Sequence, residues 1–281
     1  MQKRMSVFLI ALVLLLGVGF VLTMLTKSRR LNARVACTNN LREQSQFAID
    51  ATQRLEAARQ AKQIAEIQGF VPAGTLFHAD LAVDRRFSWI AAGLPYLNQR
   101  RQDTVELHKQ LNLNLAWNAD ENAAVAKTRL VLFTCPANIP EPTAEGYFPT
   151  SYVGIGGVKD DAPTLGFGPP IPARIGAMQY DKPTPLQLIY DHDGLSNSAM
   201  IAEVSQNLGP WIRGGSSSCR TLNPDAPALG TNAQFGGNHE GIVAIAFCDG
   251  SNRFLTDRTD AAIIRALFTI AGKESDPLPG E

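Results

Sequence analysis

The strongest hydrophobic pattern in the chain is an unbroken apolar run near its N-terminus, "SVFLIALVLLLGVGFVLTMLT", Ser6 to Thr26. The run carries no charged residue and is long enough for a helix to cross the hydrocarbon core of a membrane. A cleaved signal peptide is the alternative, but such a peptide has a shorter apolar stretch that ends at a small-x-small site. The end of the run and the two residues after it, "LTMLTKS", do not supply that site. The pattern therefore predicts a retained transmembrane helix over residues 6–26, after a short cytoplasmic tail, residues 1–5.

The helix is expected to continue beyond this run. Residues 27–68 contain no proline or glycine and are rich in Ala, Arg, Glu and Gln, which are strong helix formers. Apolar and small residues recur at three- and four-residue steps, with polar interruptions, until Gly69 and Pro72 end the pattern. These residues are Leu31, Val35, Thr38, Leu41, Ser45, Ala48 and Leu55. We predict a spine helix over residues 27–68, either a simple stalk or coiled coil or a helix whose outer half packs on the body. The polar interruptions make a strict coiled coil the weaker alternative.

The rest of the chain, residues 69–281, mixes short helical and strand patterns with long loops rich in glycine and proline. Helices are expected at "FSWIAAGLPYLNQRR", broken at Pro95, and at "NADENAAVAKTR", with Asn118 or Asp120 as its cap. Strands are expected at "LVLFTC", "TSYVGIGG", "LQLIYD" and "SAMIAEV". The segment "DAAIIRALFTIAG" predicts a final amphipathic helix, capped by Asp260 and ended by Gly272. This order predicts an α+β fold with an antiparallel sheet.

A hairpin is expected at "GIVAIAFCDGSNRFL", because Asp249 and Gly250 lie between two runs of strand formers. A two-residue turn would pair Ile245 with Phe254, and these two residues would share one face of the sheet with Phe247. Both faces of the first strand are apolar, so the hairpin is predicted to be covered on both sides.

A histidine, His239, precedes this hairpin by enough residues to exclude a shared site with Asp249. An extended strand places the two about 30 Å apart, and a turn at Glu240 still leaves about 20 Å. Asp249 is therefore interpreted as a turn former whose carboxylate accepts backbone N–H groups. His239, together with Asn238 and Gly241, is interpreted as fixing the bend before the strand, unless a residue distant in the sequence gives it a functional role.

The overall charge gives no reason to expect a nucleic-acid partner. The chain has 26 basic and 26 acidic residues. Charge near the apolar run is less balanced: Lys3 and Arg4 precede it, whereas Lys27, Arg29, Arg30 and Arg34 follow it. The positive-inside rule would therefore keep the body in the cytoplasm. Four cysteines without metal or redox spacing instead favour an oxidising compartment, so these two observations disagree.

Candidate binding residues occur in two loops. Asp191 and Asp193 in "YDHDGLSNS" could contact a divalent cation, but the spacing fails the calcium-loop pattern and favours a turn between strands. Trp211 and Arg213 in "GPWIRGG" could form an exposed contact pair, although a packing tryptophan is more common. The familiar catalytic and metal-binding motifs are absent, so no catalytic residue, metal site or cofactor is expected.

Several segments, in order, resemble a large bacterial family of pseudopilin-like proteins, domain of unknown function 1559, which ends in an H-x9-D-G motif. The similar segments are "ARVACTNNLREQ", "FSWIAAGLPYLNQ", "AWNADENAAVAKTRLVLFTCP", "TSYVGIGG", "DGLSNSAMIAEV", "FGGNHEGIVAIAFCDGSNRFL" and "IRALFTIAGKE". In this sequence the motif places His239, Asp249 and Gly250, next to Asn238. The similar segments together span nearly the whole chain.

The resemblance implies a layout like that of type IV pilins and type II secretion pseudopilins. In that layout the N-terminal helix is half anchor and half spine, and an antiparallel sheet packs on it outside the cytoplasm. The chain departs from the prepilin processing pattern, because Gly19-Phe20 lies deep in the span and no glutamate occurs there. The resemblance therefore implies a tethered relative rather than a filament subunit.

Cys37 and Cys135 fall on positions that match this family, whereas Cys219 and Cys248 do not. If the body is extracytoplasmic, the simplest of three connectivities pairs Cys37 with Cys135 and Cys219 with Cys248. The first bond would clamp the spine to the body, and four free buried thiols are the alternative.

These observations predict a single-pass protein of the bacterial inner membrane with an extracytoplasmic domain over residues 69–281. Its expected role is envelope or secretion-related assembly through protein partners or a homo-oligomer, without enzymatic activity. An anchored binding module for a glycan or a divalent cation is the main alternative, and an uncharacterised hydrolase is a weaker one.

Overall fold

The computed structural model describes residues 2–57, 69–97 and 103–272, with the side chains of the first helix described for residues 12–49. The helices are α1 (Gln2–Ala57), α2 (Trp89–Gly93), α3 (Thr104–Lys109), α4 (Ala123–Ala126), α5 (Leu186–Asp191) and α6 (Ala261–Leu267). The strands are β1 (Phe70–Val71), β2 (Tyr152–Val158), β3 (Thr184–Pro185), β4 (Ala199–Glu203), β5 (Cys219–Leu222), β6 (Ile242–Phe247) and β7 (Asn252–Thr256). This mixture confirms the predicted α+β class.

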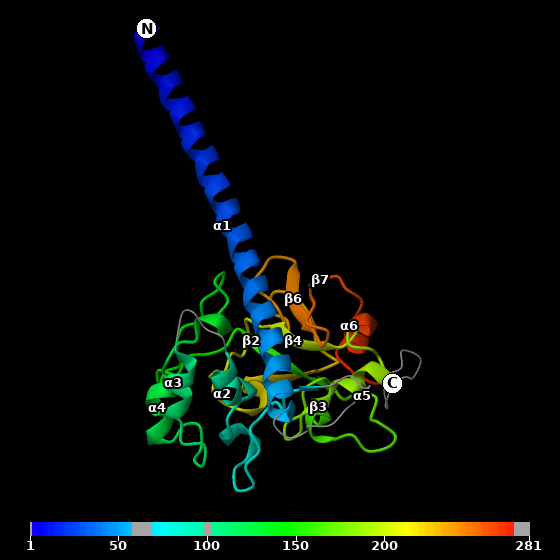
Figure 1. Cartoon of the computed structure of the whole chain (residues 1–281). Coiled ribbons are helices and arrows are strands. Elements are labelled where there is room, and N and C mark those ends of the chain that lie inside the picture. Colours follow the sequence, from blue (N-terminus) through cyan, green and yellow to red (C-terminus); the bar gives the residue numbers. More distant parts are fainter. Residues whose placement is uncertain (1, 58–68, 98–102, 273–281) are drawn as a thin grey trace.

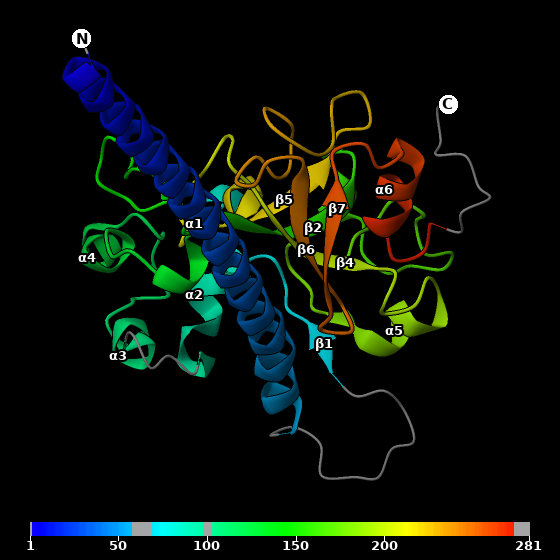
Figure 2. The ribbon, with the colours of Figure 1, turned by 90° about the horizontal axis from the view of Figure 1, so that it is seen from above.

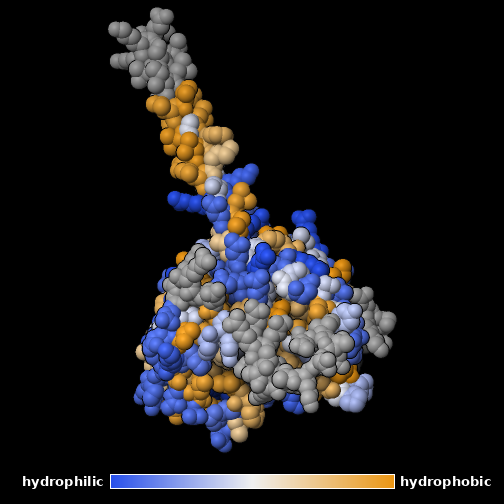
Figure 3. Space-filling model, in the orientation of Figure 1, coloured by the Kyte–Doolittle hydropathy of each residue, from blue (hydrophilic) through white to orange (hydrophobic). Residues whose placement is uncertain are grey.

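The first helix projects far out of the body at its N-terminal end, and its other end lies along the body (Figure 1). By length and composition it could cross a membrane, and its apolar window is unburied. Figure 3 shows this apolar surface on the projecting part of the helix. A membrane span over residues 6–26 and a spine beginning at 27 remain predictions, and the predicted end of the spine, 58–68, lies outside the described residues.

The outer half of the predicted spine packs on the body. Leu41, Ser45 and Ala48 of the predicted stripe are buried, whereas Leu31 and Val35 are exposed where the helix leaves the body. Helices α2, α3 and α4 lie on one side of α1, and β6, β7 and α6 lie on the other (Figures 1 and 2). The packed helix, rather than the bare stalk, is therefore the arrangement found.

The main sheet has five strands in the order β5-β2-β4-β6-β7. Strands β2, β4, β6 and β7 pair antiparallel, as predicted, and β5 joins β2 in parallel. A second, two-stranded antiparallel sheet pairs β1 with β3. The parallel β5 is reached through the long loop after β4, because a parallel neighbour requires a crossover connection.

Alternation along the central strands divides the apolar core into two clusters, one on each face of the sheet. Tyr152 and Ala244 belong to the cluster that includes residues of α1, whereas Val153 and Ile245 belong to the cluster that includes residues of α6. The sheet is therefore covered on both faces, by helices from the two ends of the chain.

Two predicted strands are helical. "LVLFTC" forms a 3₁₀ turn, Val131–Phe133, since side chains of α1 satisfy its backbone: Gln44 donates to the carbonyl of Leu132 at 2.8 Å and Asn40 to that of Thr134 at 3.3 Å. "LQLIYD" forms α5, which buries residues three apart in the sequence. Short apolar runs fit a strand or a buried helix equally well, and tertiary packing decided both cases.

The hairpin between β6 and β7 forms, but its register differs by one residue from the prediction. Phe254 pairs with Ala244 rather than with Ile245. The N–H of Phe247 bonds the carbonyl of Ser251 at 2.9 Å, which leaves a three-residue loop ending at Gly250 with φ of 80°. A loop of this length places the αL glycine after a type I turn and shifts every later residue to the other face. Strand β7 is the sheet edge and stays partly exposed, so only β6 is covered on both sides.

The predicted helices form at their expected positions within the described residues, but not with all of their predicted caps, and the predicted end of the first, residues 98–101, lies outside the described residues. Helix α2 gives way at Pro95 to a 3₁₀ turn, Leu94–Tyr96, as predicted. The Asp260 side chain caps α6 by accepting from the N–H of Ala262 at 2.7 Å. That helix ends at Leu267, before Gly272. Helix α4 begins after a short 3₁₀ turn and shows no side-chain cap.

Candidate functional site

Four side chains with metal-ligating or nucleophilic atoms meet where α1 crosses the sheet. They are Cys37 of α1, Cys135 after the 3₁₀ turn Val131–Phe133, Glu203 at the end of β4, and His239 before β6. All four are buried, and their ligand atoms lie within 4.8 Å of one another. We call this group the clamp cluster. It joins four segments that are distant in the sequence.

Cys37 and Cys135 form a disulfide, with Cα atoms 5.6 Å apart and a sequence separation of 98. This bond ties α1 to the body, and it is one of the two pairings in the simplest predicted connectivity. Local hydrogen bonds support the same contact without the sulfur atoms. Gln44 and Asn40 bond the segment that carries Cys135, and the Asn252 side chain of β7 donates to the carbonyl of Thr38 at 3.1 Å.

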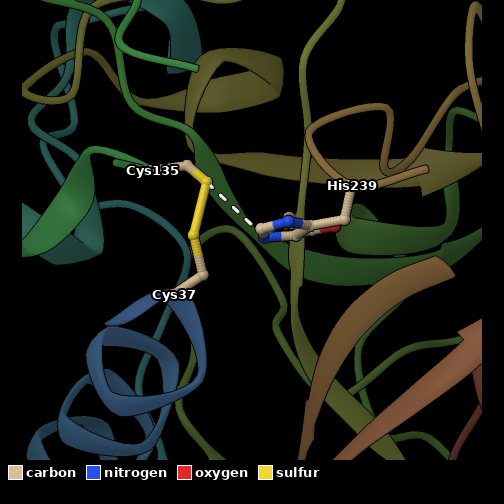
Figure 4. Close-up of side chains that lie close together, drawn as sticks. Cys37, Cys135 and His239 are labelled. Atoms are coloured by element: carbon tan, nitrogen blue, oxygen red, sulfur yellow. Dashed lines mark hydrogen bonds and ion pairs between the residues drawn. A yellow bond between two sulfur atoms is a disulfide. The ribbon is translucent and has the colours of Figure 1, made fainter. Parts of the chain in front are cut away.

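His239 points its ring toward the disulfide (Figure 4). Its Nε2 lies 3.8 Å from Sγ of Cys135 and 3.6 Å from Oε2 of Glu203, and its side chain is only 4% exposed. Burial, reinforced by the positive charge of Arg34, lowers the pKa of His239. The imidazole is therefore neutral at physiological pH and can offer Nε2 as an acceptor or a ligand.

The backbone around His239 forms the bend that the sequence predicted. His239 and Ile242 form an isolated antiparallel β-bridge, and Gly241, which lies between them, adopts a φ of 70°. Asn238 donates from its side chain to the carbonyl of Val204 at 3.0 Å and accepts from Asn138 at 3.1 Å. His239 thus fixes the bend and also contacts residues distant in the sequence.

Glu203 is fully buried opposite Tyr152 on β2. Among the described residues, neither carboxylate oxygen completes a hydrogen bond. Burial raises the pKa of Glu203 to about 8, although the N–H of Ala244 and the charge of Arg34 oppose the shift. A buried acidic side chain without a well-formed hydrogen bond is costly and unusual, so this position requires a chemical explanation.

Arg30, Arg34 and Glu240 form the solvent-facing rim of the cluster. Arg30 pairs with the Glu240 carboxylate at 3.2 Å, and Arg34 donates to the Glu240 carbonyl at 3.4 Å. The Arg30–Glu240 side chains are 73% and 86% exposed, so this pair adds little stability. The rim places positive charge next to the buried cluster.

The predicted pairing of Cys219 with Cys248 is wrong, because both are free and buried. Cys219 begins β5 and Cys248 follows β6, and two strands lie between these two in the sheet. Three strand spacings correspond to about 14 Å, whereas disulfide-bonded Cα atoms lie about 4.4–6.8 Å apart.

The residues of the two candidate binding loops make local structural contacts. Asp193 accepts from the N–H of Gly272 at 2.9 Å, and Asp191 accepts from the Gln187 side chain at 2.7 Å. Trp211 is fully buried, and its Nε1 donates to the carbonyl of Thr128 at 2.9 Å, so the exposed contact pair is wrong. Its large ring fills the core instead.

Arg213 pairs with Asp84 at 3.2 Å. Asp249, the other end of the H-x9-D-G spacing, accepts from the N–H of Ser251 at 2.9 Å and is a turn former, as predicted. It does not belong to the clamp cluster.

Glu203 was not predicted as a site residue, because no motif marks it. The available signal was a glutamate at the end of the apolar strand "SAMIAEV", a position where a charged residue faces the core or ends the strand. Cys37, Cys135 and His239 were each identified, but their meeting point was not. Only the topology brings α1 beside the ends of β4 and β6.

In a comparison with family models, residues 67–223 match the model of a family described as a protein of unknown function (DUF1559). Neither the curated proteins nor the solved structures give a match. Of the clamp cluster, Cys135 and Glu203 lie within the matched residues. The match covers more than half of the chain, and the protein therefore belongs to the DUF1559 family.

Proposed function

We propose that this protein is a single-pass inner-membrane protein whose extracytoplasmic body supports envelope or secretion-related assembly through protein contacts, without catalysis. The observation that carries the proposal is the division of α1 into two parts. Its N-terminal part is apolar and exposed, and its C-terminal part is buried in the body (Figure 3). A helix built in this way supports a body at a fixed distance and orientation from a bilayer.

The clamp strengthens the connection between anchor and body. A covalent bond between Cys37 and Cys135 prevents the body from detaching from α1, so a force on one is transmitted to the other. The disulfide itself favours an oxidising compartment over the cytoplasm. These two points support the extracytoplasmic orientation and a pseudopilin-like, load-bearing role.

The hollow surface near α5 gives little support to the alternative of glycan or cation binding. It has a volume of about 400 Å³ and is open to solvent. Phe167, Pro169, Pro170, Ile171, Ala173 and Ala271 line it, with His192. A glycan or cation site needs several convergent polar groups, and this lining offers one imidazole.

The orientation can be tested with single exposed cysteines and a membrane-impermeant maleimide. Arg258 is exposed on the body, so an Arg258→Cys variant should react in intact spheroplasts. The native thiols of Cys219 and Cys248 are buried and should remain silent in the folded protein. Lys3→Cys, in the predicted tail, is the matched control and should react only after lysis. Labelling in the opposite order would place the body in the cytoplasm and reject the proposal.

Protein contacts can be tested in the same membranes. Crosslinking with a short amine-reactive reagent, followed by mass spectrometry, should join the body to envelope proteins or to a second copy of this chain. If crosslinks of α1 and the body remain wholly within single chains at native expression, the assembly role is rejected.

A further inference from the structure

The clamp cluster has the composition of a transition-metal site as well as of a disulfide. It offers two sulfur atoms, one imidazole nitrogen and one carboxylate, all within 4.8 Å. Zn²⁺ prefers four such ligands in a tetrahedral arrangement. We propose that, when the Cys37–Cys135 bond is reduced, Cys37, Cys135, Glu203 and His239 bind one Zn²⁺ ion, so that α1 is clamped either by a disulfide or by a metal.

The distances around His239 fit this geometry. Ordinary zinc bond lengths place neighbouring ligand atoms of a tetrahedral site about 3.4–3.8 Å apart. Nε2 of His239 lies 3.8 Å from Sγ of Cys135 and 3.6 Å from Oε2 of Glu203. The imidazole therefore needs no large rearrangement, whereas the two sulfur atoms must separate when their bond is broken, and ligand atoms that now lie up to 4.8 Å apart must move closer together.

The unpartnered carboxylate of Glu203 gives the second, independent observation. Neither oxygen completes a well-formed hydrogen bond among the described residues, although the N–H of Ala244 and Nε2 of His239 lie near, and the residue is fully buried. A disulfide is a poor partner for a carboxyl group, because it has no proton to donate. A divalent cation would satisfy this group, which explains an otherwise costly acidic residue in the core.

The charges of the metal-bound cluster also balance. Two thiolates and the Glu203 carboxylate carry three negative charges, and Zn²⁺ supplies two positive ones. Arg34 lies close enough to act on both Glu203 and His239, and it supplies the third positive charge. A buried site with zero net charge avoids the large cost of burying an uncompensated ion.

The cysteines should stay together after reduction, because other contacts hold α1 in place. Leu41 is fully buried, and the bonds from Gln44, Asn40 and Asn252 do not involve sulfur. The two thiols therefore remain on facing segments.

In the proposed switch the reductant is a dithiol, either a protein or a small molecule. One of its thiolates attacks a cysteine sulfur to form a mixed disulfide, and its second thiol resolves that bond. The products are the two cysteine thiols of this protein and the oxidised reductant. Zn²⁺ then displaces one proton from each thiol and one from Glu203 where that carboxyl is protonated, while neutral His239 donates its lone pair.

The full-length protein in detergent, reduced with a thiol-free phosphine, can be titrated with Co²⁺ as a spectroscopic substitute for Zn²⁺. We expect one Co²⁺ per chain, with thiolate charge-transfer bands and the ligand-field bands of a tetrahedral site, and displacement by Zn²⁺. The oxidised protein should show neither. If reduced protein with an intact circular dichroism spectrum shows no such bands, or if reduction unfolds the body, the inference is wrong.

Variants separate this site from the other thiols. Glu203→Gln and His239→Asn should each weaken Co²⁺ binding at least tenfold, and the oxidised form of each variant serves as its folding control. A Cys219→Ala/Cys248→Ala double variant is the matched control and should bind like the original protein. Loss of the bands in that double variant, or unchanged affinity in both single variants, would place the metal elsewhere and refute the assignment.

Discussion

The two faces of the five-stranded sheet are held by different kinds of interaction. The face toward α6 is closed by apolar packing, including Phe235 and Phe268, whose rings meet edge-to-face with centroids 4.9 Å apart. The face toward α1 also buries apolar side chains, but it includes a disulfide, a buried carboxyl group and side-chain bonds to backbone carbonyls.

The difference shows how the same sheet can be stabilised in two ways. The α6 face depends on side-chain volume, which is insensitive to redox state and pH. The α1 face depends on a covalent bond and on titratable groups, so its stability follows the chemistry of its compartment.

Truncation on the α6 face should have the largest effect. Phe268 is fully buried. Phe268→Ala should lower the free energy of unfolding by about 3–5 kcal/mol, because it removes apolar contacts and leaves a cavity. Thermal unfolding under oxidising and reducing conditions measures the loss, which should be the same in both. A loss that disappears on reduction would mean that the two faces are not independent.

Breaking the clamp should have the next largest effect. Cys135→Ser, or reduction with a chelator present, should lower the free energy of unfolding by about 2–4 kcal/mol, since the bond closes a loop of 98 residues. Cys248→Ala is the matched control, because that thiol is buried but free. A reductant should lower the free energy of unfolding of this variant by no more than it lowers that of the original protein. Equal melting temperatures for the oxidised and chelated reduced forms would contradict the clamp.

The pH dependence should identify Glu203. Its pKa in the folded state, about 8, lies above its ordinary value of 4.5, so the folded protein holds this proton more tightly than the unfolded chain. Its contribution is fully present below pH 4.5 and is lost as the pH rises toward 8, by at most about 1.4 kcal/mol per pH unit. Glu203→Gln should flatten this slope in denaturant unfolding of the oxidised protein. If stability changes with pH in the same way in the two proteins, the carboxyl group of Glu203 does not hold its proton more tightly in the folded state.

The turn after β6 should have the smallest effect, because it belongs to neither face. Asp249→Ala removes the bond to the N–H of Ser251 and should cost about 1 kcal/mol. Urea unfolding measures the loss, and cobalt binding by the reduced protein should be unaffected. An unchanged midpoint would mean that the carboxylate is not needed for the turn, and Asp249→Asn, which keeps an acceptor, should recover most of the loss.

Several parts of this protein could be predicted from local patterns of residue type and spacing. The apolar run, the continuous helix, the α+β class, the strands at Tyr152 and Ala199, and the turn at Asp249 all follow from spacing and residue type. The Cys37–Cys135 bond was anticipated only through family resemblance. The helix, the strands and the turn need few contacts distant in the sequence, so propensity and periodicity are sufficient to predict them.

The other features depend on contacts between segments that are distant in the sequence. Burial against α1 turned "LVLFTC" into a 3₁₀ turn, and a three-residue loop moved Phe254 to the other face of the sheet. Strand order kept Cys219 away from Cys248. The same strand order brought Glu203 and His239 beside the disulfide, because neighbouring strand ends meet at one edge whatever their separation in the chain. Glu203 in particular has no local signal, since its position beside the disulfide depends on which helix covers the end of β4.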